Sequence, residues 1–364
     1  METNHAFPLD AYFDEAQVNA ATVEHYGGGH INETYLITLP DGKYILQKLN
    51  TYVFKHPEDV MDNMVKICDF LHTCVEARGG DVHRELLNVV YTKDGRHSVI
   101  TEDGEFWRMT EFIDHTQTYD VIETPAMFEQ CAIAFGTFQN ELALFPAATL
   151  KETIPDFHNT PDRYRQFEEA IAENKAGRLS NVADEIAFVK EHRPVCNKLM
   201  DLLHEGKLPL RVTHNDTKLS NILYDTEKNE PICVIDLDTT MPGLVAYDFG
   251  DAIRGGAGTA AEDEKDLSKV GVNLDLFDAF TKGFLSTVGK SLTELEIDTL
   301  PDGAILMTLE CGIRFLTDYL NGDVYFRTAY PEHNLVRAHN MFKMVTEMET
   351  NRDKLDAIIR KYKA

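Results

Sequence analysis

The sequence is poor in basic residues and lacks the patterns that bind structural metals or cross membranes. It holds 35 Lys and Arg against 61 Asp and Glu, a formal net charge of -26. Nucleic acids and anionic membranes are bound mainly through Lys and Arg, so this balance argues against both classes of partner. No apolar run approaches the roughly 20 residues needed to span a bilayer. Residues 1–17 lack the basic start of a secretory signal.

The cysteines form no Cys-x-x-Cys pair, which is the spacing typical of structural zinc sites. Most of them lie in apolar runs, which predicts reduced core thiols in a cytoplasmic protein. The six are Cys68, Cys74, Cys131, Cys196, Cys233 and Cys311. With 364 residues, 43% of them hydrophobic, the chain can bury a large core without disulfides and is long enough for two domains. We expect it to be a monomer.

The first third of the chain has the pattern of an antiparallel β domain with one inserted helix. A strand from about residue 22, a glycine turn and two strands around the hairpin signal Asp41-Gly42 come first. Apolar residues then recur every three or four positions from Val60 to Val75, which predicts a helix that ends at Gly79-Gly80. The two hairpin strands are 34–39 and 43–49, and the strands predicted after the helix are 86–91, 99–101 and 106–113.

Beyond residue 114 the pattern becomes mainly helical. A buried-face periodicity runs from Met127 to Leu142, and helical patterns fill residues 151–205 and the chain after about residue 260. Two short strand-like segments, 210–212 and 232–235, enclose a polar loop. The sequence therefore predicts an α+β fold, with a β-rich N-terminal lobe of residues 1–114 and a larger, mainly helical C-terminal lobe of residues 115–364.

The polar loop carries the clearest chemical pattern. It belongs to the run RVTHNDTKLSNIL, residues 211–223, which places Asp216, Lys218 and Asn221 close together in the chain. A carboxylate can orient a substrate hydroxyl and accept its proton, and a lysine two positions later can neutralise charge on a transferring phosphate. Asp216 and Lys218 are therefore the candidate catalytic residues. The alternative is a polar turn whose side chains only cap backbone groups.

Two further acids follow the second short strand. Asp236 and Asp238 come directly after the apolar residues 232–235. Together with Asn221 they offer hard oxygen ligands of the kind that Mg²⁺ binds. We therefore expect Asn221 and Asp236 to hold Mg²⁺ on nucleotide phosphates. Asp238 would add a ligand for a second metal ion or brace the loop.

The run YGGGHINETY, residues 26–35, is the candidate phosphate-binding turn. Glycines between strands let backbone N–H groups approach phosphate oxygens closely, and polar side chains after them can add donors. A plain glycine-rich hairpin turn is the alternative. The nucleotide-binding candidates in this run are Gly27, Gly28, Gly29, Asn32 and Thr34.

These motifs resemble the protein-kinase catalytic loop, His-x-Asp-x-x-x-x-Asn, followed by a metal-binding Asp. The usual Asp-Phe-Gly after the strand is replaced by Asp-Leu-Asp. The loop, the run VIDLDTTMPG and the later YDFGDAIR are similar to the aminoglycoside-phosphotransferase and choline-kinase branch of small-molecule kinases. The resemblance implies a protein-kinase-like two-lobed fold, ATP and Mg²⁺ as cofactors, and a hinge at 109–115. In kinases the hinge backbone binds adenine, which points to Glu111 and Ile113.

The third strand departs from the kinase pattern, in which a lysine on this strand pairs with a glutamate on the next helix. Strand alternation puts Gln47 at the position of that lysine and Lys48 on the opposite face. Either Gln47 and Asn63 form a neutral pair, or a one-residue bulge turns Lys48 inward. Both Gln47 and Lys48 are therefore candidates for nucleotide binding.

Further runs, among them HINETYLI, FIDHT and ECGIRFLTDYLNGDVYF, resemble those of N-acetylhexosamine 1-kinases, in the same order over nearly the whole chain. That family phosphorylates the anomeric C1 hydroxyl of N-acetylglucosamine and N-acetylgalactosamine with ATP and Mg²⁺. The resemblance implies direct in-line transfer, with the sugar between Asp216, His30, Arg314 and Tyr325. An arginine fork and a tyrosine suit a neutral sugar, because they offer hydrogen-bond donors beside an apolar ring face.

Each sugar-binding candidate also has a purely structural alternative. Arg314 could pair with Glu310 or Asp318, each four residues away on a helix. Tyr325 could be a core aromatic, and His30 could cap its turn.

Two rival functions are also compatible with the sequence. The first is a kinase of the same fold that acts on an aminoglycoside, choline or a homoserine-like alcohol, which the acidic net charge would suit. The second is a nucleotide-binding regulator without catalysis, suggested by the altered third strand.

Overall fold

The computed structural model describes residues 7–27 and 31–363. By its internal contacts the chain divides into two compact units. Unit 1 comprises Met1–Thr118, Leu144–Pro155 and Asn221–Pro242, and unit 2 comprises Tyr119–Ala143, Asp156–Ser220 and Gly243–Ala364. Because the chain passes between the units several times, neighbouring parts of one sequence motif belong to different units.

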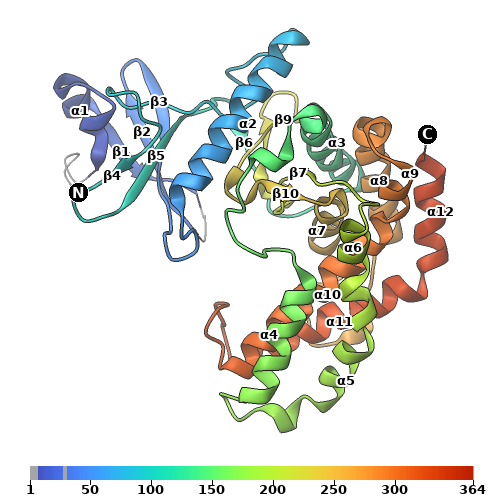
Figure 1. Cartoon of the computed structure of the whole chain (residues 1–364). Helices are drawn as coiled ribbons and strands as arrows, with labels where there is room; N and C mark the ends of the chain where they lie inside the picture. Colours follow the sequence, from blue (N-terminus) through green and yellow to red (C-terminus); the bar gives the residue numbers. More distant parts are fainter. Residues whose placement is uncertain (1–6, 28–30, 364) are drawn as a thin grey trace. The chain divides into compact units, whose positions relative to one another are not determined.

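Unit 1 is built on a five-stranded antiparallel sheet with the strand order β1-β2-β3-β5-β4 (Figure 1). Side chains alternate between the two faces of such strands. One face carries Ile37, Leu46 and Met109, which are fully buried in the core of this unit. The strands are β1 (Thr22–His25), β2 (Glu33–Leu39), β3 (Gly42–Lys48), β4 (Val99–Ile100) and β5 (Phe106–Glu111).

The helix α2 (Pro57–Ala77) follows β3, as the sequence predicts. Proline fits its first turn, where the missing N–H group has no helical partner to lose. The apolar positions from Val60 to Val75 are buried on one face. The helix ends before Gly79, whose φ of 74° is the left-handed conformation that glycine adopts readily. A shorter helix, α1 (Glu15–Ala20), precedes β1.

The segment Asn221–Pro242 adds a small hairpin to unit 1. β8 (Ile222–Asp225) pairs with β9 (Pro231–Val234), and β6 (Thr116–Gln117) pairs with the other edge of β8. A short 3₁₀ turn, η7 (Leu237–Thr239), follows, and β10 (Met241–Gly243) carries the chain into unit 2. The hairpin therefore determines where the predicted metal ligands lie.

Unit 2 is mainly helical and is packed closely enough to require glycine at some helix crossings. A Cβ atom on Gly250 would collide with the backbone of Gly303, which lies on a neighbouring helix. The elements are α3 (Pro125–Glu141), α4 (Thr160–Glu173), α5 (Ala183–Glu191), α6 (Arg193–His204), β7 (Arg211–Thr213), α7 (Val245–Gly256), α8 (Leu274–Val288), α9 (Glu294–Asp298), α10 (Leu300–Asn321), α11 (His333–Thr350) and α12 (Arg352–Tyr362).

The predicted fold class is confirmed: an antiparallel sheet with one helix inserted after its third strand, and a larger helical part. The strand predicted at 86–91 is wrong. Among residues 7–27 and 31–363 this segment makes one bridge, between Val89 and Thr110, and two further backbone bonds to β5. The reason is that β4 already occupies the start of the same edge of β5. The strand β8 was in turn missed within the predicted loop.

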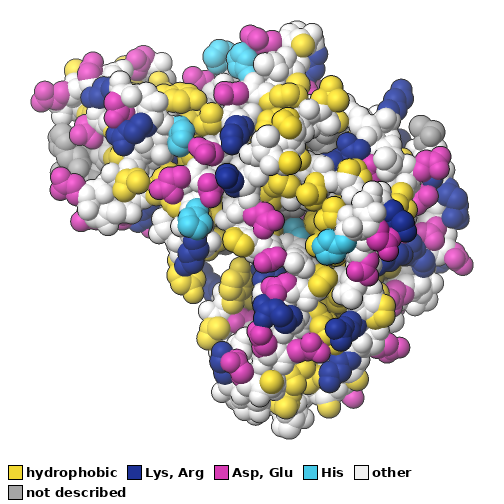
Figure 2. All heavy atoms as spheres, in the orientation of Figure 1, with side chains coloured by type: hydrophobic (Ala, Val, Ile, Leu, Met, Phe, Trp, Pro, Cys, Tyr) yellow, Lys and Arg dark blue, Asp and Glu magenta, His cyan; other side chains and the backbone are white. Residues whose placement is uncertain are grey.

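Surface charge, apolar helices and cysteine burial are the structural features on which the composition bears. Acidic and basic side chains are both spread over the face seen in Figure 2. Within residues 7–27 and 31–363 no helix is both long and apolar enough to cross a membrane. Four of the cysteines, Cys68, Cys131, Cys196 and Cys233, are buried, as expected for core thiols.

Candidate active site

The predicted catalytic loop follows β7 in unit 2 and is held by two acids of α7. Asp248 is buried and accepts hydrogen bonds from the backbone N–H groups of His214 (2.9 Å) and Asn215 (2.7 Å). Asp251 accepts one from the backbone N–H of Thr217 at 3.0 Å. Burial raises the pKa of Asp248, although the nearby His214 and the two backbone hydrogen bonds oppose this shift. The backbone on both sides of the candidate catalytic acid is therefore fixed by α7.

Neither acid of α7 was among the predicted site residues, although the run that contains them had been singled out. Burial alone would raise the pKa of Asp251, but the guanidinium of Arg254, at 2.8 Å, lowers it below its usual range. Asp251 thus stays ionised and can only accept hydrogen bonds. The sequence signal was the spacing of two acids on one face of a helix. It did not indicate that their partners would be backbone N–H groups of the catalytic loop.

Asp216 is half-buried, and its carboxylate forms an ion pair with Nζ of Lys218 at 2.7 Å. The preceding residue, Asn215, has a left-handed φ of 64°. Asparagine tolerates this conformation better than most residues. The tight turn brings the two candidate catalytic side chains together within unit 2.

The candidate metal ligands Asn221 and Asp236 lie at the same end of the β8–β9 hairpin in unit 1. The N–H of Ile235 donates to the C=O of Asn221 at 2.9 Å, so the residue before Asp236 lies beside Asn221. An amide and a carboxylate oxygen are donors suited to Mg²⁺, and the pair fits that ion. In the described part of the chain, no group of three or more His, Cys, Asp or Glu could hold a metal.

The third metal candidate, Asp238, is bound by two protein side chains of unit 1. One carboxylate oxygen forms an ion pair with Nη1 of Arg108 at 2.5 Å, and both side chains are only 2% exposed. The other oxygen accepts a hydrogen bond from Nδ2 of Asn32 at 2.7 Å. Both carboxylate oxygens therefore already have strong partners, as a bracing role would require.

The third strand settles which side chain faces the helix. β3 pairs with β2 and β5 in a continuous register that places Gln47 opposite Arg108, so the bulge considered as one alternative is not formed. Lys48 lies on the other face of the sheet, in ion pairs with Glu33 (2.7 Å) and Glu105 (3.3 Å). These acids raise the pKa of Lys48, and the hydrogen bond that Lys48 donates to Glu33 acts most strongly.

The other alternative for this strand, a neutral pair between Gln47 and Asn63, is not formed either. Gln47 donates to the hydroxyl of Thr34 at 3.1 Å. Asn63 instead donates to the backbone C=O groups of Lys151 (2.8 Å) and Thr240 (3.0 Å). Asn63 therefore ties α2 to two other segments of unit 1 and does not reach the third strand.

Arg108 was not predicted as a site residue. Its Nε donates to Oε1 of Gln47 at 3.0 Å, and its Nη1 lies 3.6 Å from Sδ of Met64. It thus connects β5, β3 and α2 around Asp238. The available signal was an arginine inside a strand of otherwise apolar and β-prone residues, because a charge at such a position needs a buried partner.

The glycine turn is described in part. Gly27 has a φ of 74°, and a side chain there would meet no atom of the described residues within 4 Å, so its backbone conformation is what favours glycine. Gly28, Gly29 and His30 lie outside the described residues. Asn32 and Thr34 are partners of Asp238 and Gln47, as described above.

The predicted hinge residues lie at the end of β5. The N–H of Glu111 donates to the C=O of Asn88 at 2.9 Å, and the C=O of Ile113 accepts a hydrogen bond from the Thr116 hydroxyl at 2.7 Å. A carbonyl oxygen has two lone pairs, so that of Ile113 keeps capacity for a second donor. Their contact with adenine stays a prediction.

Arg314 and Tyr325 are brought together in unit 2. Nη2 of Arg314 donates to the hydroxyl of Tyr325 at 3.4 Å. The guanidinium lies 5.4 Å from the ring centre of Phe326 and 5.9 Å from that of Phe157, within the range of cation–π attraction. Tyr325 is 64% exposed, so the alternative of a core aromatic is wrong.

The helical ion pair considered for Arg314 is not formed, because both acids have other partners. Among the described residues no carboxylate lies within 4.0 Å of this guanidinium. Glu310 is buried, with Nδ1 of His158 at 2.9 Å and the Thr160 hydroxyl at 2.6 Å. Burial raises the pKa of Glu310, but these hydrogen bonds outweigh it and leave the pKa below its usual value.

His158 also connects this region to the catalytic loop. Its Nε2 lies 3.4 Å from the backbone O of Asn215, the residue before the candidate catalytic acid. A chain of polar contacts therefore runs within unit 2 from Glu310 on α10 through His158 to Asn215. Sequence reasoning missed His158, which no motif distinguishes from other histidines.

Asp318 organises the loop that carries Tyr325. One of its carboxylate oxygens accepts the backbone N–H groups of Val324 (2.9 Å) and Tyr325 (2.8 Å). The other accepts the N–H of Phe326 (2.9 Å) and Nδ2 of Asn334 (2.9 Å). The four donors compensate the burial of this acid and hold the loop against α10.

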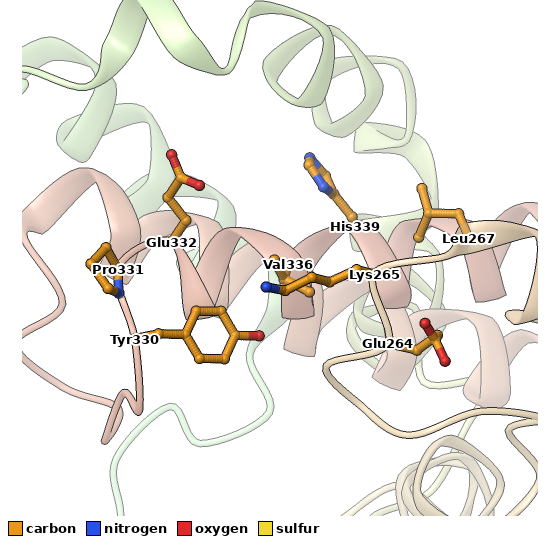
Figure 3. Close-up of a pocket in the computed structure, with 8 residues that line it drawn as sticks. All are labelled: Glu264, Lys265, Leu267, Tyr330, Pro331, Glu332, Val336 and His339. Atoms are coloured by element: carbon orange, nitrogen blue, oxygen red, sulfur yellow. The ribbon is translucent and has the colours of Figure 1, made fainter.

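A separate pocket of about 270 Å³ lies in unit 2 beside α11 (Figure 3). Nζ of Lys265 lies 4.6 Å from the ring centre of Tyr330 at its wall. None of the predicted site residues that the structure describes lines it. Its lining residues are Glu264, Lys265, Leu267, Tyr330, Pro331, Glu332, Val336 and His339.

Solved structures of small-molecule kinases share this fold. A microcompartment-associated aminopropanol kinase is 18% identical with a TM-score of 0.65, and the alignment covers 97% of each chain. For choline kinase from Cryptosporidium parvum the identity is 12% and the TM-score 0.56, with 98% of this chain and 96% of that chain covered. A spectinomycin phosphotransferase, solved with ADP and spectinomycin, gives 14% and 0.55, with 90% and 93% covered. The chain has the protein-kinase-like fold of these enzymes.

The family follows from the sequence itself. A model of the phosphotransferase enzyme family matches residues 22–269, more than half of the chain. The matched region includes the glycine turn, the catalytic loop and both acids of α7. The chain belongs to the phosphotransferase enzyme family.

Proposed function

We propose that this protein transfers the γ-phosphoryl group of ATP to the anomeric C1 hydroxyl of an N-acetylhexosamine, giving the sugar 1-phosphate and ADP. Family membership supports phosphoryl transfer, and the sequence resemblance supports the acceptor. The observation that carries the proposal is the Arg314 guanidinium, which lies among aromatic rings with Tyr325 as its hydrogen-bond partner. Arginine in this setting offers N–H donors in a rigid fork, which suits hydroxyl and amide oxygens of a neutral sugar.

The charge of this region argues against a cationic acceptor. Arg163 donates to the backbone O of Phe157, whose ring lies beside Arg314. Burial lowers the pKa of Arg163, and the cation of Arg314 lowers it further. The acids Glu310 and Asp162 act on the pKa of Arg163 in the opposite direction, but their carboxylates are already bonded to neighbouring side chains. The guanidinium groups of Arg163 and Arg314 would therefore repel an amine such as choline or an aminoglycoside. A neutral acceptor, by contrast, would accept their hydrogen bonds and place its C–H groups on the rings.

The catalytic loop would act on the hydroxyl of this acceptor. Asp216 would orient the C1 hydroxyl towards the γ-phosphorus and accept its proton as the new bond forms. Lys218, now paired with Asp216, would offset charge on the transferring group. The contacts of His158 with Glu310 and Asn215 would keep this loop aligned with α10, which carries Arg314.

The nucleotide would bind to the groups of unit 1. Asn221 and Asp236 would hold Mg²⁺, which would neutralise phosphate charge when bound. The glycine turn, including Gly27, would offer backbone N–H groups to the phosphates. Glu111 and Ile113 would contact adenine through their backbone.

A screen of ADP release against a panel of acceptors tests the proposal. The panel sets N-acetylglucosamine and N-acetylgalactosamine beside glucose, choline, ethanolamine, homoserine and kanamycin. Release with the two acetamido sugars, and none with the amines, is the expected result. Turnover with an amine and with neither acetamido sugar would show that the acceptor belongs to the alternative class. Tight ATP binding without release for any acceptor would favour a non-catalytic regulator.

A further inference from the structure

Arg108 on β5 and Asp238 in the turn after β9 form a buried ion pair, and the proposed reaction gives Arg108 no role. Arg108 and Asp238 are each only 2% exposed, and their charged groups lie 2.5 Å apart. Removing two charges from water is costly, and an apolar pair of similar size is often as stable. The pair therefore calls for a reason other than stability.

The location of the pair points to that reason. Asp238 lies two residues after Asp236, the proposed magnesium ligand, within the turn η7. Arg108 faces Gln47 across the strands, and Gln47 stands where kinases place their lysine on the third strand. The cation on this face of the sheet is therefore Arg108 of β5, whereas protein kinases carry theirs on the third strand. Its partner Asp238 lies in the turn η7, which directly follows the proposed metal ligand Asp236.

The turn η7 follows a residue with a strained backbone, so contacts with other segments are needed to keep it in place. Asp236 has φ 61° and ψ 56°, the left-handed conformation that a non-glycine residue adopts at a cost. Such a conformation persists only where neighbouring contacts enforce it. Asp238 supplies these contacts through Arg108 on one carboxylate oxygen and Asn32 on the other.

We infer that Arg108 is a positioning residue, which acts through Asp238 to hold Asp236 in the conformation that binds magnesium and does not contact the phosphates itself. The inference rests on the proposed function, since it takes Asp236 as a ligand of the nucleotide-bound metal. Partners behind a metal ligand commonly contribute about 10–100-fold to metal affinity.

The test is the gain in ATP affinity on adding Mg²⁺, measured by titration calorimetry with Mg²⁺ and with EDTA. For Arg108→Met and Asp238→Asn we expect this gain to fall by about 10–100-fold, with the affinity in EDTA unchanged. The double variant should lose no more than the worse single variant, because both act through one contact. Arg108→Lys, which keeps the charge and loses the fork, should fall in between.

Two variants control for folding and for the loss of any arginine. Arg84 forms an ion pair with Asp225 at 2.8 Å in the same unit, and Asp225 lies at the opposite end of the β8–β9 hairpin from Asn221 and Asp236. Arg84→Met should keep the full effect of Mg²⁺. If Arg108→Met does not give a cooperative thermal melt, the apolar pair Arg108→Met with Asp238→Leu replaces it, and the same loss is expected.

Three results would overturn the inference. A folded variant without the pair that keeps the full gain from Mg²⁺ would show that the pair does not position Asp236. A loss of ATP affinity in EDTA for Arg108→Met would indicate direct phosphate contact. If the unsubstituted protein shows no gain from Mg²⁺, the proposed function fails together with this inference. A normal gain without phosphorylation of any acetamido sugar would refute only the proposed acceptor.

Discussion

Replacing Asp318 by Asn would separate acceptor binding from nucleotide binding. Each carboxylate oxygen of Asp318 accepts two hydrogen bonds, and three of the four donors are backbone N–H groups of residues 324–326. Asn has one oxygen and one NH₂ group. Whichever way the amide is turned, two donors therefore face an NH₂ group and lose their acceptor.

The magnitude follows from these two lost bonds. A buried donor without a partner costs about 1–3 kcal/mol, so the substitution costs about 2–6 kcal/mol if the loop stays in place. The loop can lower this cost by leaving α10, which would remove Tyr325 from Arg314. Loss of one hydrogen bond and one ring contact, about 1.5–3 kcal/mol, corresponds to roughly a 10–150-fold rise in the KM for the acceptor.

The assay is steady-state kinetics with N-acetylglucosamine and ATP varied in turn, together with a thermal melt. We expect the KM for the sugar to rise and the KM for ATP to stay unchanged. Asp302→Asn is the matched control, because Asp302 lies buried on the same helix in ion pairs with Arg352 and Lys198. It should lower the melting temperature and leave the KM for the sugar unchanged. Equal effects of both variants on this KM would refute the reasoning.

Further predictions concern the proposed chemistry and its support. Asp216→Asn should lower kcat by about 10²–10⁴-fold with nearly normal ATP affinity, and normal turnover would remove its assignment. Asp236→Ala should abolish the effect of Mg²⁺ on ATP titrations, so a normal titration would count against its metal role. Arg314→Lys should raise the KM for N-acetylglucosamine, since the fork is lost while the charge remains; an unchanged KM would place the sugar elsewhere. Burial raises the pKa of Glu310, but the hydrogen bond and charge of His158 leave it below the usual 4.5. Its contribution to stability should be complete above that pH and be lost as the pH falls through the lower folded value. The melting-temperature difference from Glu310→Gln should therefore shrink on acidification, and a constant difference would contradict this assignment.

Local patterns in the sequence were sufficient for much of the fold. The hairpin around Asp41-Gly42 and the buried face of α2 follow from short-range periodicity, and both appear in the structure. The segment 86–91 also has a β-prone composition, yet β4 occupies part of the edge it would need. Competition for one strand edge is decided by tertiary structure, which composition does not encode.

The candidate site shows the same division between local and distant information. The loop spacing singled out Asp216 and Asn221, because the motif is continuous in the chain. Arg108 could not be assigned in this way, since its partner Asp238 is brought to it only by the folding of unit 1. His158 was missed for the same reason, because its contacts join three distant segments of unit 2.

The phosphorus NMR spectrum of the product formed from ATP and N-acetylglucosamine tests the central claim most directly. We predict a new phosphomonoester signal coupled to the anomeric proton, as in a 1-phosphate, appearing together with ADP. A signal coupled to the protons at C6, or inorganic phosphate as the only product, would contradict transfer to the anomeric hydroxyl.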